Sequence, residues 1–394
     1  MSPAKISIAG AGLGGLAAAS CLMKAGHEVE IYEQAPALAE VGAGIQISAN
    51  AFHVMRHLGL GEELLKVGVR PGAYVFRLHD TGEELQRFSL SEAHERQHGA
   101  PYVQLHRADL HDILAARARA FRSDVVRLDH RLVEFTQDSR GVEARFANGA
   151  VARGDLLIGA DGLKSVVRRQ LWGDAPATYT GDGAWRLVVP TERLPTPRLD
   201  PVMSVFMGPG GHAVCYYLRA GALLNFVGII ETDDISEESW TLKLPWEKLK
   251  KDFEGWHPAL QTVIDCADKN EVYRWSLHNR APIRAWGEGR VTLLGDSAHP
   301  TLPYLAQGAV MAIEDGAVLT RALGMCASVE DALKLYERNR VDRTAKIVEQ
   351  STFNRRLFHL PSVQAMRDAF ANRDEGEDRN TWLYSYNPLT VELA

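Results

Sequence analysis

The sequence predicts an α/β protein in which a β-rich segment interrupts an α/β domain and a helical segment follows. Three observations support this class. Residues 5–32 form a strand, helix and strand pattern, residues 182–231 hold four apolar stretches typical of strands, and the chain beyond residue 309 is mainly helical. With 394 residues, 46% hydrophobic and 24% charged, the chain suits two or three globular domains and excludes a disordered or fibrous protein.

The first predicted domain begins with a βαβ unit. Residues 5–9 form an apolar strand, residues 13–25 a helix and residues 27–32 an alternating strand, and Gly26 stands where a glycine ends a helix. The elements that follow it are a Gly/Ala loop at 42–44, a helix over 50–58, paired strands over 73–79 and 84–90 around the turn at 80–82, and a helix over 108–121.

The remaining elements follow from the same periodicities. Short strands are expected over 125–158, where Asn148-Gly149 is a strong hairpin signal. Further strands are expected over 184–190, 202–207, 212–218, 223–230 and 291–294, and helices over 246–253, 258–267 and 309–323. The predicted division is a first domain over 1–175, a β-rich insert over 176–275, the rest of the first domain over 276–325 and a C-terminal helical segment over 326–394.

Charge and cysteine usage exclude several classes of protein. The net charge of −6 argues against a nucleic-acid partner. Glycines and serines interrupt the uncharged residues 6–23, so we expect no signal peptide, no membrane association and a cytoplasmic location. The cysteines form no C-x-x-C and no His/Cys cluster with metal-ligand spacing, which predicts a reducing compartment, no metal, and four buried thiols at Cys21, Cys215, Cys266 and Cys326.

The strongest motif is a G-x-G-x-x-G that follows the first strand and opens the first helix. Its glycines permit a tight turn, a close approach to a pyrophosphate and close helix packing, and the helix N-terminus faces the phosphates. Glu33 ends the next strand, where it can accept hydrogen bonds from ribose hydroxyls and disfavours a 2′-phosphate. The motif predicts a Rossmann-like domain that holds FAD or NAD through Gly10, Gly12, Leu13, Gly14, Gly15, Glu33 and Gln34.

A single fingerprint leaves an NAD-dependent dehydrogenase and a flavoprotein as alternatives. Asp161-Gly162 and Gly295-Asp296 each follow a buried strand and precede a helix. An aspartate there lies where an open α/β sheet presents groups to a ligand, although either one could simply cap its helix. Two such sites beside the fingerprint favour the flavoprotein.

With these motifs in this order, the sequence resembles the single-component FAD-dependent aromatic hydroxylases, the family typified by para-hydroxybenzoate hydroxylase and salicylate hydroxylase. Within it the likeness is to the 3-hydroxybenzoate 6-hydroxylases, salicylate hydroxylases and 6-hydroxynicotinate 3-monooxygenases. Residues 41–46, 106–111 and 303–309 carry that likeness. It implies tightly bound FAD, transient NADH or NADPH, O₂, and a hydroxylated or amino-substituted aromatic carboxylate attacked by a flavin C4a-hydroperoxide. A decarboxylating reaction of the salicylate type stays open.

The resemblance also implies cofactor roles at matching positions. Arg107 would hold the linker region of the flavin, and Asp296 would bind its ribityl or pyrophosphate portion. Asp161 would brace the pyrophosphate and help NAD(P)H approach, since the family has no second Rossmann domain. The backbone from Pro300 through Gly308 to Ala309 would wrap the isoalloxazine, with the helix N-terminus stabilising negative charge on the reduced flavin.

The predicted catalytic pair is His212 and Tyr216, which period two places on one face of a strand. The resemblance implies that both contact the substrate; the alternative is an exposed histidine and a core tyrosine. Gln46 and Tyr304 stand where 6-hydroxynicotinate 3-monooxygenases carry histidines, and both departures weaken the case for that exact substrate. Further expected substrate contacts are Gln46, Tyr102, Pro303 and Tyr304.

Other side chains have plainer expected roles. His299 is expected to fix its turn through a ring nitrogen, and Arg186 and Arg219 are candidate carboxylate ligands or ordinary sheet charges. The aromatic stretch 382–387 is expected to pack on the body or on a second subunit, so a monomer and a homodimer both stay open.

Two other kinds of function on the same scaffold have less support. A flavin halogenase would carry a W-x-W-x-I-P motif, which the sequence lacks, and a lipid reductase would need an amphipathic anchor. A non-enzymatic redox sensor would need an effector or docking tail, whereas the tail after Asn372 is short.

Overall fold

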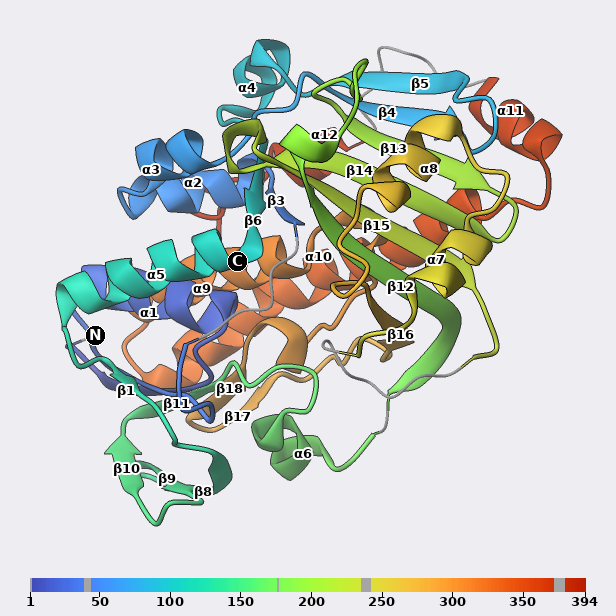
Figure 1. Ribbon diagram of the computed structural model, residues 1–394. Helices are drawn as coiled ribbons and strands as arrows, with labels where there is room; N and C mark the ends of the chain where they lie inside the picture. The colour runs from blue at the N-terminus through green and yellow to red at the C-terminus, as the bar shows by residue number, and fades with distance from the viewer. Residues whose placement is uncertain (1, 39–43, 176, 235–241, 372–379) are drawn as a thin grey trace.

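Two β-sheets, one mainly parallel and one mainly antiparallel, form the frame of the protein (Figure 1). The computed structural model describes residues 2–38, 44–175, 177–234, 242–371 and 380–394. The predicted α/β class, with a sheet-rich second unit and C-terminal helices, is confirmed. The predicted loop residues 42–43, the boundary at residue 176 and the tail from Asn372 to residue 379 lie outside the described residues.

The parallel sheet carries the nucleotide fingerprint. Its strands β18, β11, β1, β2 and β7 are parallel neighbours in that order, and β17 pairs antiparallel at one edge. Because these strands run the same way, the residues that follow them meet at one edge of the sheet. The bounds are β17 (Gly287–Glu288), β18 (Val291–Leu293), β11 (Leu156–Gly159), β1 (Lys5–Ala9), β2 (Glu28–Tyr32) and β7 (Val126–Arg127).

Helices and a small sheet lie on opposite sides of the parallel sheet in Figure 1, where the helices are drawn above it. Gly26 has φ +94° and follows the first of these helices, as predicted. The hairpin at Asn148-Gly149 also forms, joining β9 to β10. The helices are α1 (Leu13–Lys24), α5 (Arg107–Phe121) and α9 (Gly308–Met325); the small sheet is β8 (Leu132–Asp138), β9 (Gly141–Phe146) and β10 (Val151–Gly154).

The second sheet has seven strands, and the predicted insert does not contain all of them. β4 and β5 come from before residue 90, and β16 crosses the boundary predicted at residue 275. β4 joins the sheet through a parallel pairing with β13. This contact is long-range, so the local periodicity of the sequence does not predict it. The strand order is β16 (Tyr273–Asn279), β12 (Thr178–Pro190), β15 (Leu223–Glu231), β14 (Gly211–Leu218), β13 (Met203–Gly208), β4 (Ala73–Leu78) and β5 (Glu84–Ser89).

Helices cover both faces of this sheet. α7 (Trp246–Asp252) and α8 (Pro258–Asp265) pack on the face that carries Ala213, Cys215 and Tyr217. α10 (Val329–Phe358) and α11 (Val363–Ala371) pack on the other, where Val214 lies. The period-two prediction for β14 is therefore confirmed.

Several short elements complete the fold, and most of them were not predicted. Among them, β3 pairs antiparallel with β6 beside the second sheet. The aromatic stretch near the C-terminus packs back on α10, where the Arg343 guanidinium lies 3.7 Å from the Tyr386 ring centre. The short elements are β3 (Gly44–Ile47), β6 (Val103–His106), α2 (Ala49–His57), α3 (Gly61–Val67), α4 (Glu92–His98), α6 (Val166–Trp172) and α12 (Thr381–Tyr384), of which α2 and α6 were predicted as helices.

Small residues let α1 and α9 cross closely. A Cβ on Gly14 would come within 2.9 Å of the Ala312 Cβ, and one on Gly316 within 2.7 Å of the Ala18 Cα. The crossing brings the N-terminus of α9 near the fingerprint glycines that begin α1.

A buried charge cluster fixes α9 to its neighbours. Asp315 accepts hydrogen bonds from the Gly295 amide at 3.0 Å, from His299 Nε2 at 2.6 Å and from Arg340 Nε at 2.7 Å. The preceding Glu314 pairs with Arg340 and Arg343, at 2.7 Å in each case. Burial alone would raise the pKa of both carboxyls, but the facing arginines and His299 outweigh it and hold each pKa below its usual value.

The thiols only partly match the prediction. Cys21 and Cys215 are buried, and burial raises the pKa of Cys21 to about 12. Cys266 and Cys326 are partly exposed, so the prediction of four buried thiols is wrong for these two.

Among the described residues, no helix has an apolar stretch long enough to cross a bilayer.

We expect Gly316→Ala to lower the free energy of unfolding by about 1–3 kcal/mol, because the added methyl group meets the backbone of α1. Gly324→Ala is the matched control on the same helix, since nothing lies within 4 Å of its added Cβ. It should be neutral or stabilising by up to about 1 kcal/mol. Urea unfolding followed by circular dichroism measures both, and equal losses would contradict the close crossing.

Arg340→Met should destabilise the protein by about 3–5 kcal/mol at neutral pH, because Asp315 loses a buried counter-charge. Without that arginine, burial raises the pKa of the carboxyl in the folded state. The variant therefore regains stability relative to wild type as the pH falls below about 5. Unfolding at several pH values tests this, and Arg338→Met, at an exposed position on the same helix, should stay within about 0.5 kcal/mol of wild type.

Candidate functional site

Four predicted motifs meet at the carboxyl edge of the parallel sheet. Gly295-Asp296, Asp161, the fingerprint and Glu33 follow the adjacent strands β18, β11, β1 and β2. A Cβ on Gly10, which has φ +103°, would lie 2.4 Å from the Ala160 carbonyl oxygen, so the two loops touch. A Cβ on Gly15 would lie 2.1 Å from the Gly10 carbonyl oxygen, which leaves no room for another residue type.

The edge offers two helix N-termini that no side chain caps. Gly12 precedes α1, and a Cβ added to it would meet nothing within 4 Å. Neither α1 nor α9 has a side-chain cap or an acidic residue in its first turn. Asp296 is exposed although its neighbours are buried, and its Oδ1 lies 4.0 Å from where a Gly308 Cβ would stand. Backbone amides that no side chain caps, with free space beside Gly12, suit a dinucleotide pyrophosphate and the negative charge of a reduced flavin.

Glu33 and Asp161 already accept backbone hydrogen bonds. The Glu33 carboxylate accepts from the amides of Ala11 and Ala35, at 2.8 and 2.9 Å. Asp161 Oδ2 accepts from the amides of Val166 and Val167, so it does cap α6, the alternative left open above. Its Oδ1 is buried without a partner among the described residues, and burial raises its pKa.

The other predicted cofactor residues lie along the same edge. Leu13 is buried in the first turn of α1, Gln34 is exposed after β2, and Arg107 is the first residue of α5. Pro300 is buried and Ala309 is partly exposed, on either side of the turn that leads into α9. Val41 to Ala43, part of the likeness to the hydroxylases, lie outside the described residues.

Three of the predicted substrate residues lie together. The Tyr102 hydroxyl donates to Gln46 Oε1 at 2.5 Å, and the Gln46 side chain lies close enough to Tyr216 to act on its pKa. Burial outweighs that contact and raises the pKa of Tyr216, so its hydroxyl stays protonated and can donate a hydrogen bond.

A hydrogen-bond chain ends on His212, which offers an acceptor. Glu231 Oε1 lies 3.2 Å from His359 Nδ1, and His359 Nε2 lies 2.9 Å from His212 Nδ1. A carboxylate only accepts, so His359 donates through Nδ1 and must accept at Nε2 from His212. His212 is left with a lone pair on Nε2, and burial lowers its pKa, so the ring is neutral at neutral pH. His212 is 2% exposed, so the exposed alternative is wrong.

Tyr304 lies beside His212, but its hydroxyl is already engaged. The ring centres are 5.3 Å apart, and the Tyr304 hydroxyl donates at 2.6 Å to Asp182, which Arg355 also binds through both oxygens. Asp182, Glu231 and His359 are near enough to share a cation, but the Arg355 guanidinium already pairs with both carboxylates. Pro303 is exposed at the start of the 3₁₀ turn that holds Tyr304.

The arginines of the second sheet serve other contacts. Arg219 pairs with Asp109 through two hydrogen bonds, at 2.9 and 2.7 Å, and Arg186 lies over the rings of Tyr273 and Trp275. One polar residue close to Tyr216 was not predicted from the sequence. Asn225 lies opposite Tyr216 in the β14–β15 ladder and accepts a hydrogen bond from the Gly44 amide at 2.9 Å. Its buried Nδ2 has no partner among the described residues.

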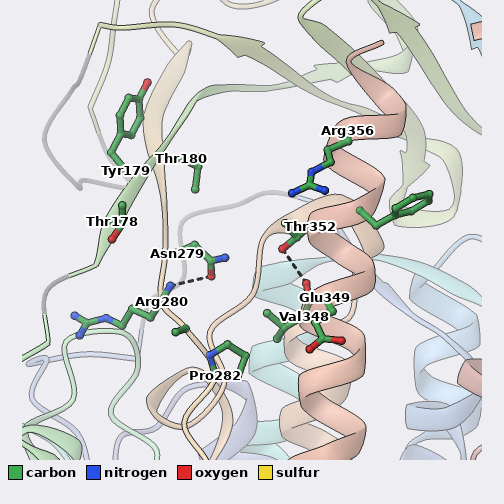
Figure 2. A pocket seen from close by; sticks show the side chains of 12 residues that line it. Thr178, Tyr179, Thr180, Asn279, Arg280, Pro282, Val348, Glu349, Thr352 and Arg356 are labelled. Atoms are coloured by element: carbon green, nitrogen blue, oxygen red, sulfur yellow. Dashed lines mark hydrogen bonds between the residues drawn. The ribbon is translucent and has the colours of Figure 1, made fainter. Parts of the chain in front are cut away.

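Two cavities flank these elements. A cavity of about 560 Å³ lies between α10 and residues 178–180 and 279–282 (Figure 2), and none of the predicted site residues lines it. A cavity of about 200 Å³ includes Leu305, Asn354 and Tyr384 in its wall. It adjoins the predicted site, because the Tyr384 ring centre is 6.0 Å from that of Tyr102 and Asn354 donates to the Tyr304 carbonyl.

Other residues at the site were also missed. His359 lies 147 positions from His212 and 128 from Glu231 in the chain, so no motif links it to them. Glu314 and Asp315 could have been found, because adjacent acids inside an otherwise apolar helix must be paired with buried cations. His299 fixes its turn through Nε2, as expected.

Comparison with known proteins identifies the family. A family described as an FAD binding domain matches residues 4–351. The chain is 38% identical to 3-hydroxybenzoate 6-hydroxylase of Polaromonas naphthalenivorans, over 97% of this chain and 96% of that protein. It is 35% identical to 6-hydroxynicotinate 3-monooxygenase of Bordetella bronchiseptica, over 89% and 91% of the two chains. The crystal structure of Klebsiella pneumoniae HpxO complexed with FAD and uric acid matches with a TM-score of 0.84, 28% identity and coverage of 98% and 96%.

These matches span both sheets and the helices between them, so they include the cofactor edge and the substrate side together. They decide between the alternatives left by a single glycine fingerprint in favour of the flavoprotein. The chain therefore belongs to the single-component FAD-dependent aromatic hydroxylases and is itself an FAD-dependent monooxygenase.

Proposed function

We propose that this monooxygenase hydroxylates a small aromatic acid held between Tyr216 and His212. One observation carries the proposal: a buried, protonated Tyr216 hydroxyl and the neutral His212 ring lie on the same face of β14, the first a donor and the second an acceptor through Nε2. Four residues apart in a strand, the two Cα atoms are about 13 Å apart, which suits a ring with polar groups at two positions.

The donor end suits the carboxylate. Tyr216 keeps its O–H proton because burial raises its pKa, and the Asn225 Nδ2, which has no partner among the described residues, lies opposite it. Neutral donors can hold a carboxylate by hydrogen bonds without an arginine. This supports a carboxylate at the end of the site nearest Gly44.

The acceptor end suits a ring hydroxyl. His212 Nε2 can accept a phenolic proton, and loss of that proton makes the ring more electron-rich at its ortho and para positions. FAD, reduced by NADH or NADPH, supplies the electron transfer and the activation of O₂ when it is bound. The fingerprint glycines, Glu33, Asp161, Asp296 and the turn from Pro300 to Ala309 would hold it. Low exposure of Tyr216, His212 and Tyr304 keeps water from the ring.

Two expectations from the sequence stay predictions. The scattered cysteines favour a reducing, cytoplasmic compartment, and both a monomer and a homodimer remain open. A product with or without loss of CO₂ separates the decarboxylating reaction from simple hydroxylation.

We expect purified holoenzyme to oxidise NADH or NADPH at least about tenfold faster with one acid of a panel than without it. The panel is 3-hydroxybenzoate, 4-hydroxybenzoate, salicylate, 6-hydroxynicotinate and 3-amino-4-hydroxybenzoate, with benzoate as the control that lacks the hydroxyl. NAD(P)H absorbance, O₂ uptake and product mass measure the reaction. Equal rates with all six acids and with none would contradict the proposed function.

Tyr216→Phe should raise KM for the stimulating acid by about tenfold, because a hydrogen bond to a charged group is worth about 1.5 kcal/mol. Tyr217→Phe is the matched control: it is adjacent, faces the opposite side of β14, and its hydroxyl donates to the Leu199 carbonyl at 2.7 Å. That variant should keep the wild-type KM. Steady-state kinetics measure both, and equal KM values for the two variants would remove Tyr216 from the substrate site.

A further inference from the structure

His212 is buried, yet it is connected to the surface. Its Nδ1 contacts His359 Nε2 at 2.9 Å, and His359 Nδ1 contacts Glu231 Oε1 at 3.2 Å. The His359 side chain is 1% exposed and that of Glu231 is 47% exposed. These two contacts therefore connect the buried His212 ring to solvent. His359 follows α10, and Glu231 ends β15.

We infer that His359 and Glu231 form a proton relay that carries the phenolic proton of the substrate from His212 to bulk water. The relay rests on the proposed function, because it begins at the substrate hydroxyl. A buried base without an exit could take a proton only by becoming an imidazolium in an apolar site, which costs free energy. A relay lets His212 take one proton while it releases another, so its ring stays neutral.

The transfers balance. The substrate O–H bond breaks as an N–H bond forms at His212 Nε2, and the His212 Nδ1–H bond breaks as one forms at His359 Nε2. The His359 Nδ1–H bond breaks as an O–H bond forms at Glu231, which then loses that proton to water. The net change is phenol to phenolate plus one proton in solvent. Both rings end in the opposite tautomer, and running the relay backwards restores them and returns a proton to the product.

The charged groups around the relay favour this direction. Arg355 lies between Asp182 and Glu231, at 2.5 and 3.4 Å, so one guanidinium faces two carboxylates, and the remaining negative charge attracts the proton toward the surface. Tyr304, which donates to Asp182, faces His212 from the turn before α9. Phe358 covers the His212 ring, with ring centres 5.1 Å apart, which keeps water away from the first transfer. The only hydrogen-bonded route from the ring, among the described residues, is through His359.

The test measures proton release when substrate binds to the oxidised holoenzyme, so it does not depend on turnover. Holoenzyme is mixed in weak buffer with the panel acid that most stimulates wild type, and a pH indicator dye reports the proton by stopped flow. Wild type should release about one proton per site. His359→Gln keeps hydrogen-bonding groups at this position but cannot pass a proton, so release should slow by about tenfold or more. Added imidazole should restore part of the rate.

Two further variants make the result decisive. Glu231→Gln, at a half-exposed position that does not threaten folding, should slow release in the same sense but less. His278→Gln, on β16 with its ring bonded to the Ser276 carbonyl, should match wild type. Wild-type release rates in both His359→Gln and Glu231→Gln, or a stimulated wild type that releases no proton, would overturn the relay. A wild type that no panel acid stimulates would overturn the proposed function instead.

Discussion

The buried pairing of Asp315 with Arg340 is the interaction on which the cofactor edge depends. A single carboxylate inside α9 holds the amide of Gly295, the ring of His299 and the guanidinium of Arg340. It therefore holds three segments together: the turn after β18, the residues that lead into α9, and the long helix α10. Charges buried this deeply are retained only when fully paired, so the arrangement has one stable geometry. The exposed Asp296 owes its position to that geometry, because the residues on either side of it are fixed.

Close helix packing adds to the same constraint. The glycines that let α1 and α9 cross also align their N-termini toward one edge of the sheet. Backbone amides can then face a cofactor at two points without a basic side chain. The mild acidity of the chain is compatible with binding an anionic dinucleotide, since the attraction is local and comes from helix ends and backbone groups.

The parts of the site predicted from sequence are those with local patterns. The fingerprint, Glu33, Asp161 and Asp296 lie at strand ends, and a parallel sheet must bring neighbouring strand ends together. Period two likewise placed His212 and Tyr216 on one face of β14. Tertiary contacts were beyond reach: His359 meets His212 across 147 positions, and β4 joins β13 by parallel pairing without any adjacent turn. For Tyr304 the position was found but the partner was not, because its bond to Asp182 depends on how η4 (Pro303–Leu305) packs on β12.

The pairing of β4 with β13 limits which segments can be exchanged between related enzymes. The β4–β5 hairpin is encoded between the two halves of the cofactor edge, yet it completes the sheet that faces the substrate. A chimera that moved only residues 176–275 between relatives would pair β13 of one protein with β4 of the other, so the side chains at this strand junction would no longer match. The segments that must be exchanged together to transfer substrate preference are therefore discontinuous in the sequence. They are the β4–β5 hairpin and the β-rich insert. Natural recombination at a single point would tend to separate them.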